Sequence, residues 1–186
     1  MGLTLANVLT ILRMVVIPFF IMAVGYSRSG WAFALFVAAG VTDMLDGLIA
    51  RVWKQQTTVG AILDPMADKL LLVSSFIVLG FQGGIAPWLV VLVVSRDLIV
   101  VLGYFILYFV HQQAMEVDPS RLGKVNTFFE LFTVGFALMS LARPELSLGW
   151  VNVLFQSVTA MTTAASGLQY VYRGLLWHQK RGSVAA

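Results

Sequence analysis

Four aspartates lie at fixed spacing inside two stretches of sequence that are otherwise apolar. Asp43 and Asp46 belong to the first stretch, and Asp64 and Asp68 belong to the second. An ionised carboxylate in a lipid-embedded helix is energetically costly unless a cation or a proton compensates its charge. A cluster of such groups therefore predicts bound divalent metal.

The residues around these acids follow a helical spacing. In each stretch the polar and small residues recur at steps of three and four, which places them on one helical face. Gly47, Ala50 and Arg51 share the face of the first stretch, and Gly60 shares that of the second. Small residues let helices or a ligand approach closely, and an arginine can hold a phosphate oxygen. Two such faces opposite each other predict a pocket of carboxylate oxygens.

Carboxylate oxygens define the chemistry that this pocket can perform. The motif contains no histidine and the chain no cysteine, so the donor set suits magnesium, manganese or calcium rather than zinc or copper. Divalent ions held by shared carboxylates neutralise a diphosphate and stabilise the charge on a leaving oxygen. A carboxylate that is not used as a ligand can accept the proton of an attacking hydroxyl. The residues therefore indicate phosphoryl-type transfer.

The composition of the chain predicts an integral membrane protein. Of its 186 residues, 59% are hydrophobic and 11% are charged, with a mean hydropathy of +0.88. These values leave too few polar side chains for a surface that faces water. Because a helix needs about 20 apolar residues to cross a bilayer, the apolar runs predict six spans, over residues 6–25, 31–52, 58–80, 86–110, 122–142 and 150–173.

The connectors between these spans are too short to bury a separate core, so residues 1–186 are expected to form one domain. With six spans, both termini and the connectors after the second and fourth spans share one side, and basic residues gather there, around those connectors and at the C-terminus. The positive-inside rule therefore places both termini in the cytosol, with the aspartates at similar depths near that surface. The sequence predicts an all-α membrane protein: a bundle of six transmembrane helices with a cytosol-facing polar metal cavity, located in a bacterial inner membrane or its equivalent.

Further charged residues fall within the predicted spans, where an unpaired charge is costly. They are Arg13, Lys69, Arg96, Asp97 and Glu130. Lys69 directly follows Asp68, so its side chain projects about 100° away from that carboxylate. We expect Lys69 to form an ion pair or to reach the membrane surface rather than to join a metal site. The net charge of +3 is explained by membrane topology and gives no reason to expect a nucleic-acid partner.

Two other classes of protein are alternatives to a phosphoryl-transfer enzyme. Acidic residues also line the cation pathways of transporters, but a transporter is expected to carry them at several depths and on broken helices. A structural membrane protein can contain a contact between one aspartate and one arginine. Four acids with one neighbouring arginine are too acidic to neutralise one another, which favours the enzyme.

The same residues form an extended motif that resembles a known family. The motif reads Asp43-x-x-Asp46-Gly47-x-x-Ala50-Arg51, then eight residues, then Gly60-x-x-x-Asp64-x-x-x-Asp68. At every defined position it is similar to the signature of the CDP-alcohol phosphatidyltransferases. The similarity extends to the opening Asn7-x-x-Thr10-x-x-Arg13 and to the layout of the spans.

The resemblance implies a reaction and a role for each matching residue. The four aspartates would bind two magnesium or manganese ions across the diphosphate of CDP-diacylglycerol. Asp68 would also act as the general base for the acceptor hydroxyl, which attacks the phosphorus while CMP leaves. The CDP and diphosphate site would be lined by Asn7, Thr10, Asp43, Asp46, Gly47, Ala50, Arg51 and Gly60. The resemblance also implies a homodimer.

The acceptor alcohol depends on shorter similarities within the family. Bacterial phosphatidylglycerophosphate synthases usually carry Ala-Arg-Glu and then a second arginine in the fourth span. This chain has Ser95-Arg96-Asp97 there, without a second basic residue. That segment, together with residues 123–127 and 159–166, more closely resembles the CMP-forming cardiolipin synthases of mitochondrial type. Phosphatidylglycerol is therefore the expected acceptor, with cardiolipin as product, and glycerol 3-phosphate is the alternative.

The charge of the acceptor leads to the same preference. A phosphomonoester such as glycerol 3-phosphate carries nearly two negative charges and is expected to need more than one cation. The candidates for holding the acceptor phosphate are Arg96 and Lys124. Arg96 is equally consistent with a structural ion pair to Asp97 or Glu130.

Overall fold

The computed structural model describes the backbone of residues 5–52, 58–111 and 121–182, and within them the side chains of residues 10–44, 66–102 and 121–174. These residues form six α-helices and one short 3₁₀ helix, with no strand among them. The helices are α1 (Leu5–Gly25), α2 (Ser29–Val52), α3 (Thr58–Phe81), α4 (Pro87–His111), α5 (Arg121–Ala142), η1 (Pro144–Leu146) and α6 (Gly149–Gly182).

Each predicted span corresponds to one helix. For α1 to α5 the predicted and observed bounds differ by at most two residues. Helix α6 ends at Gly182, beyond the predicted end at residue 173. The extension contains Lys180 and Arg181, which end an apolar run but are compatible with a helix. The predicted span ends at residue 173 because it was defined by hydrophobicity, whereas the helix continues to Gly182.

The turns at one end of the bundle are tight, and their backbone amides form hydrogen bonds within the turn. Between α1 and α2, the amides of Ser27 and Arg28 donate to the carbonyls of Val24 and Ala23, at 2.9 and 2.8 Å. The α3–α4 turn passes through Gly83 at a φ of 75°, a region that glycine enters without steric cost. Such short connections make consecutive helices antiparallel neighbours.

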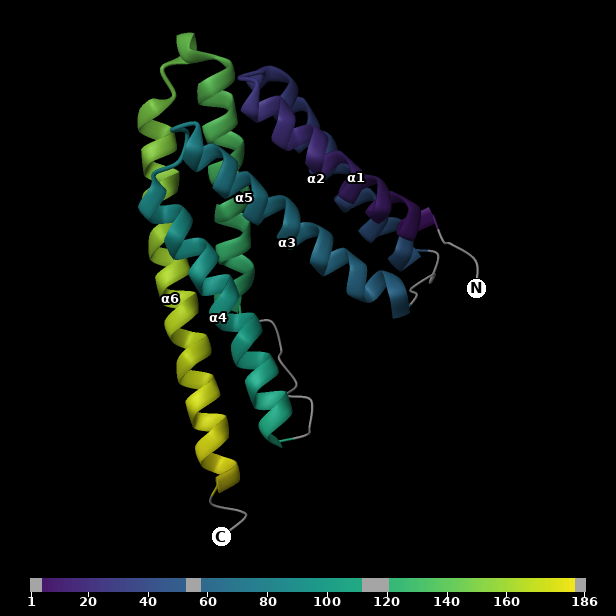
Figure 1. The fold of residues 1–186 in the computed structure, drawn as a ribbon, viewed down its shortest axis with the longest axis vertical. Helices are drawn as coiled ribbons and strands as arrows, with labels where there is room; N and C mark the ends of the chain where they lie inside the picture. Colours follow the sequence, from purple (N-terminus) through teal and green to yellow (C-terminus); the bar gives the residue numbers. More distant parts are fainter. Residues whose placement is uncertain (1–4, 53–57, 112–120, 183–186) are drawn as a thin grey trace.

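The six helices form two groups that separate toward one end (Figure 1). Helix α1 packs against α2 and α3, and α4 packs against α6. Helix α5 joins the groups, because it contacts α2, α3 and α6. Because α2 and α3 both pack against α1, residues far apart in the sequence can meet at the polar ends of these three helices.

The apolar core occupies the half of the bundle that carries the tight turns. Its fully buried side chains include Phe20 of α1, Phe76 of α3, Leu89 of α4 and Leu138 of α5. Buried polar side chains lie toward the other half of the same helices, for example Arg13, which precedes the apolar part of α1. The chain thus separates a stabilising apolar half from a polar half that is available for chemistry.

Many large apolar side chains face outward. Trp31, Phe81 and Met161 are 70%, 89% and 72% exposed, far more than a water-facing surface would favour. By length and composition, and counting only described residues, α5 is the one helix that could cross a membrane. Shorter apolar helical segments cover Thr10–Gly25 and Ser29–Met44.

Candidate active site

Two of the motif aspartates lie together against one arginine. Arg13 of α1 places its Nη1 atom 2.7 Å from Oδ1 of Asp43 on α2. The same nitrogen donates to Oδ1 of Asp68 on α3. The Arg13 side chain is 1% exposed, whereas those of Asp43 and Asp68 are 46% and 44% exposed. The guanidinium of Arg13 therefore lies on the protein side of the two carboxylates, and the other side of the carboxylates is open.

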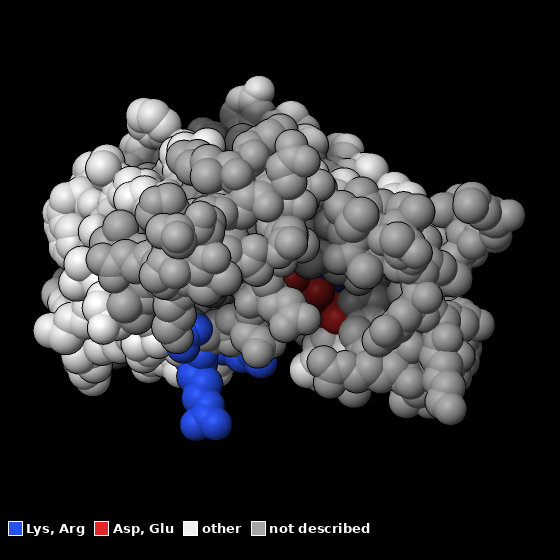
Figure 2. Space-filling model, turned by 90° about the horizontal axis from the view of Figure 1, so that it is seen from below, with Lys and Arg blue, Asp and Glu red and all other residues white. Residues whose placement is uncertain are grey.

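This contact shows that the acidic faces of α2 and α3 converge on Arg13 of α1, the helix against which both pack. A single nitrogen reaches an oxygen of each carboxylate, so a cation of similar size can bridge the pair. Seen from the lower end of Figure 1, acidic side chains lie in a hollow of the surface (Figure 2). Hard oxygen donors of this kind fit Mg²⁺ or Mn²⁺.

The rest of the predicted metal and nucleotide site lies outside the described side chains. No group of three or more Asp, Glu, His or Cys suited to a metal occurs among the side chains that are described. Thr10, one helical turn before Arg13 on α1, is fully buried. The predicted site residues that lie outside the described side chains are Asn7, Asp46, Gly47, Ala50, Arg51, Gly60 and Asp64.

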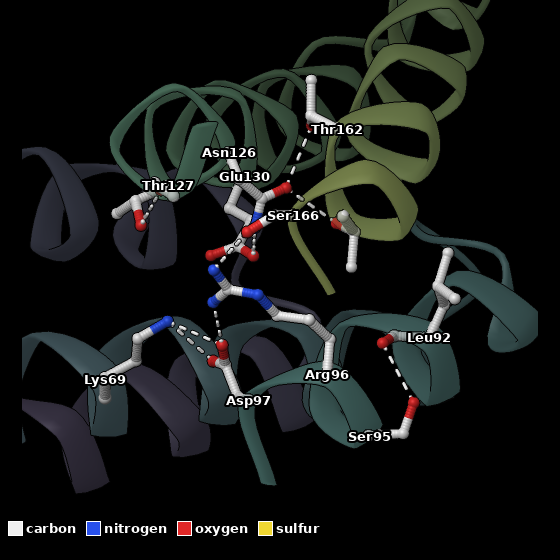
Figure 3. A network of polar contacts seen from close by, with 12 residues as sticks. Lys69, Leu92, Ser95, Arg96, Asp97, Asn126, Thr127, Glu130, Thr162 and Ser166 are labelled. Carbon is white, nitrogen blue, oxygen red and sulfur yellow. Dashed lines mark hydrogen bonds and ion pairs between the residues drawn. The ribbon is translucent and has the colours of Figure 1, made fainter. Parts of the chain in front are cut away.

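A second polar cluster joins α3 to α4 and α6. Lys69 Nζ donates to both carboxylate oxygens of Asp97 at 2.8 Å, which confirms that Lys69 turns away from Asp68 into an ion pair. Arg96 donates to Asp97 at 2.7 Å and to Ser166 Oγ at 2.6 Å (Figure 3). Both cations thus share one carboxylate, and Asp97 is the ion-pair partner of Arg96.

Helices α5 and α6 extend this cluster with further hydrogen bonds. Asn126 donates to Glu130 Oε1 at 2.6 Å and accepts from Thr162 and Thr163 at 3.0 and 2.8 Å (Figure 3). Glu130 Oε2 is buried without a hydrogen-bond partner in the part of the chain that the structure describes. The segment of α6 over residues 159–166, which is rich in small residues, therefore carries buried hydroxyl groups as well as a packing surface.

The guanidinium of Arg96 is enclosed by α6. Its central carbon lies 5.4 Å from the ring centre of Tyr170, a favourable cation–π distance. A Cβ atom at Gly167 would lie 3.4 Å from Cγ of Arg96, so the backbone of α6 passes close to this side chain. Lys124, the other predicted contact for the acceptor phosphate, is exposed near the start of α5. The structure does not bring Lys124 into this hydrogen-bonded cluster.

An apolar groove runs along α2 and α5 and ends at the acidic site. Its volume is about 520 Å³, and Asp43 is the only charged residue among the described residues that line it. Phe36 and Val37 belong to its α2 wall, and Phe132 and Phe136 belong to its α5 wall. Such a groove suits an aliphatic chain whose polar end lies near Asp43.

The fold and this site define a helical protein that combines an acidic end with surfaces suited to lipid. The family description "CDP-alcohol phosphatidyltransferase" applies to residues 3–165, which contain every predicted site residue. This chain belongs to the CDP-alcohol phosphatidyltransferase family, whose members are membrane-bound enzymes of phospholipid synthesis.

Relatives within the family carry different names. A probable phosphatidylglycerophosphate synthase of Mycobacterium tuberculosis is 33% identical over 92% of this chain and 81% of its own length. A probable CMP-forming cardiolipin synthase of Drosophila melanogaster is 34% identical over 91% of this chain and 57% of its own length. A CDP-diacylglycerol--glycerol-3-phosphate 3-phosphatidyltransferase of Sodalis glossinidius is 32% identical, covering 92% and 95%. The family is thereby established, and the relatives are named both as cardiolipin synthases and as phosphatidylglycerophosphate synthases.

Sequence reasoning did not assign a partner to Arg13. The signal was present, because a charged residue inside an apolar span requires compensation. Its partners were hidden, since Asp43 and Asp68 belong to different helices.

Proposed function

We propose that this protein transfers the phosphatidyl group of CDP-diacylglycerol to a hydroxyl of phosphatidylglycerol, forming cardiolipin and releasing CMP. The observation that carries this choice of acceptor is that Lys69 and Arg96 are both committed to Asp97. Glu130 adds a buried carboxyl group beside them (Figure 3). Little positive charge is therefore left for a phosphomonoester, whereas a singly charged diester needs less.

The donor half of the site is proposed from the family motif. Asp43, Asp46, Asp64 and Asp68 would hold two Mg²⁺ or Mn²⁺ ions, and the pairing of Asp43 with Asp68 around one nitrogen supports this donor set. When bound, such ions neutralise a diphosphate and stabilise the leaving oxygen. The residues proposed to line the CDP and diphosphate site are Asn7, Thr10, Gly47, Ala50, Arg51 and Gly60.

Asp68 is proposed to accept the proton of the acceptor hydroxyl. Its side chain is 44% exposed, so an acceptor can approach the carboxylate from the open side. The oxygen of the acceptor then forms the new bond to phosphorus, and the bond between phosphorus and the CMP oxygen breaks. Arg96, with Lys124, is proposed to lie on the acceptor side, where the free Oε2 of Glu130 can accept a hydrogen bond from a glycerol hydroxyl.

The membrane arrangement is part of the same proposal. All six helices are proposed to span the bilayer, with the acidic site facing the cytosol and two copies forming a homodimer. The outward-facing Trp31, Phe81 and Met161 support contact with lipid along helices from both groups. The groove between α2 and α5 is proposed to hold an acyl chain of a lipid substrate.

Glycerol 3-phosphate is the alternative acceptor, favoured by the names of the M. tuberculosis and Sodalis relatives. To distinguish the acceptors, purified protein in detergent is given CDP-diacylglycerol, Mg²⁺ or Mn²⁺, and one acceptor at a time. We expect CMP release and cardiolipin only with phosphatidylglycerol. Product only with glycerol 3-phosphate would reverse the choice of acceptor. Absence of CMP with either alcohol would contradict the proposed reaction in both forms.

The groove can be tested at Gly135, which belongs to its α5 wall. A Cβ atom there meets nothing within 4 Å, so Gly135→Leu should fill the groove without disturbing the fold. We expect kcat/KM with long-chain lipids to fall about tenfold, corresponding to the loss of a few methylene contacts. The loss should be much smaller with short-chain lipids.

The matched control for this experiment is Gly149→Leu, at the start of α6. Gly149 also has open space around its Cβ position, but it does not line the groove. Both variants add the same side chain to a helix. Equal losses in the two variants, or a loss at Gly135 that is independent of chain length, would refute acyl-chain binding in the groove.

A further inference from the structure

Arg13 is the one described cation in contact with the motif aspartates, and it is buried. Its Nη1 atom contacts Oδ1 of Asp43 at 2.7 Å and also donates to Oδ1 of Asp68. The three residues come from α1, α2 and α3, so the contact also ties these helices together. This single nitrogen lies between two oxygens that the family motif offers to a divalent cation.

We propose that Arg13 is a built-in counter-ion of the acidic site, which holds Asp43 and Asp68 together before metal binds and competes with the metal for their oxygens. This inference rests on the proposed metal-binding role of the two aspartates. In this role Arg13 is a positioning residue, because it acts through the carboxylates and not on the substrate.

The electrostatic reason is the repulsion between neighbouring carboxylates. Two negative charges that share one partner atom repel each other strongly in a site that is only partly open to solvent. A buried guanidinium offsets this repulsion and fixes both side chains in position before any ion arrives. The same positive charge repels an incoming divalent cation, so it lowers the affinity of the site.

The different exposure of the three side chains indicates the side from which a metal ion approaches the carboxylates. Arg13 is enclosed at 1% exposure, whereas Asp43 and Asp68 are nearly half exposed. A metal therefore approaches from the open side, and Arg13 remains on the protein side. The site would be preorganised for metal, but it would bind each ion reversibly instead of retaining it. Substrate diphosphate, which adds negative charge, would then favour loading.

The test measures Mn²⁺ binding to purified protein in detergent, without substrate, by electron paramagnetic resonance of free Mn²⁺. Arg13→Gln removes the positive charge and should lower the Kd for Mn²⁺ about tenfold. The same variant should unfold at a lower temperature in EDTA, and Mn²⁺ should stabilise it more than it stabilises the unmodified protein. Arg13→Lys keeps the charge and should leave the Kd within about threefold of the unmodified value.

Arg96→Gln is the matched control, because Arg96 is the other buried arginine among the described side chains and pairs with Asp97 instead. It is expected to lower thermal stability without changing the Kd for Mn²⁺. Should Arg13→Gln fail to fold, Arg13→Met removes the charge with an apolar side chain that suits the enclosed site, and the same tenfold decrease in Kd is expected.

The outcomes separate this inference from the proposed function. An unchanged or higher Kd for Mn²⁺ in Arg13→Gln or Arg13→Met would overturn the counter-ion role. Equal decreases in Kd for Arg13→Gln and Arg96→Gln would also overturn it, because the effect would then be one of overall charge. Absence of Mn²⁺ binding to the unmodified protein would instead refute the proposed metal site itself.

Discussion

Asp68→Asn is expected to lower turnover by about 10²- to 10⁴-fold, the usual contribution of a positioned general base. Asparagine preserves the size of the side chain but cannot accept the proton of the attacking hydroxyl. It can still accept the hydrogen bond from Arg13 that the structure gives Asp68, so the meeting of α1 and α3 should persist. Turnover is measured as CMP released from CDP-diacylglycerol, and nucleotide binding is measured separately by calorimetry with CDP.

The control for Asp68→Asn is Glu145→Gln, the same chemical change at an exposed carboxylate in η1. It should leave turnover unchanged. We expect Asp68→Asn to retain part of the CDP affinity, because the other three aspartates remain. Turnover within about twofold of the unmodified enzyme would exclude Asp68 as the base.

Asp97→Ala is expected to destabilise the protein by about 3–5 kcal/mol, the usual effect of removing one partner from a buried ion pair. The Asp97 side chain is 11% exposed and compensates both Lys69 and Arg96. Without it, the buried guanidinium of Arg96 and the ammonium of Lys69, which is 41% exposed, have no carboxylate in direct contact. The effect is measured as the midpoint of unfolding in detergent, followed by circular dichroism.

Glu145→Ala is the control for Asp97→Ala, because it breaks an ion pair whose two side chains are 69% and 63% exposed. Such a pair contributes about 0–1 kcal/mol, so little change is expected. Adding Lys69→Met to Asp97→Ala should recover part of the lost stability, since it removes one of the uncompensated cations. Equal unfolding midpoints for Asp97→Ala and Glu145→Ala would show that the Lys69–Asp97–Arg96 cluster is not a stabilising element.

The two substitutions, Asp68→Asn in α3 and Asp97→Ala in α4, probe contacts on two different faces of α3. Asp68 and Lys69 are neighbours in α3, yet Asp68 faces Arg13 of α1 and Lys69 faces Asp97 of α4. Successive residues of a helix point about 100° apart, which makes this division possible. Helix α3 thus places the proposed base between the donor half of the site and the polar cluster proposed for the acceptor.

The sequence determined the family and the positions of the helices. Apolar runs set the helix bounds because lipid-facing helices are defined by local composition, and for five of the six helices both bounds agree within two residues. The motif determined the family because its spacing is a local property of two helices. The sequence failed at the end of α6, where a polar helix continues beyond the apolar run.

The tertiary structure decided which charged groups meet. Arg96 could pair with Asp97 or Glu130, and it pairs with Asp97, while Arg13 is joined to carboxylates from two other helices. These partners depend on how each helix is rotated and on which helices pack together, and neither is encoded in the spacing along one helix. Local periodicity therefore determined the faces, whereas packing between helices determined the ion pairs that those faces form.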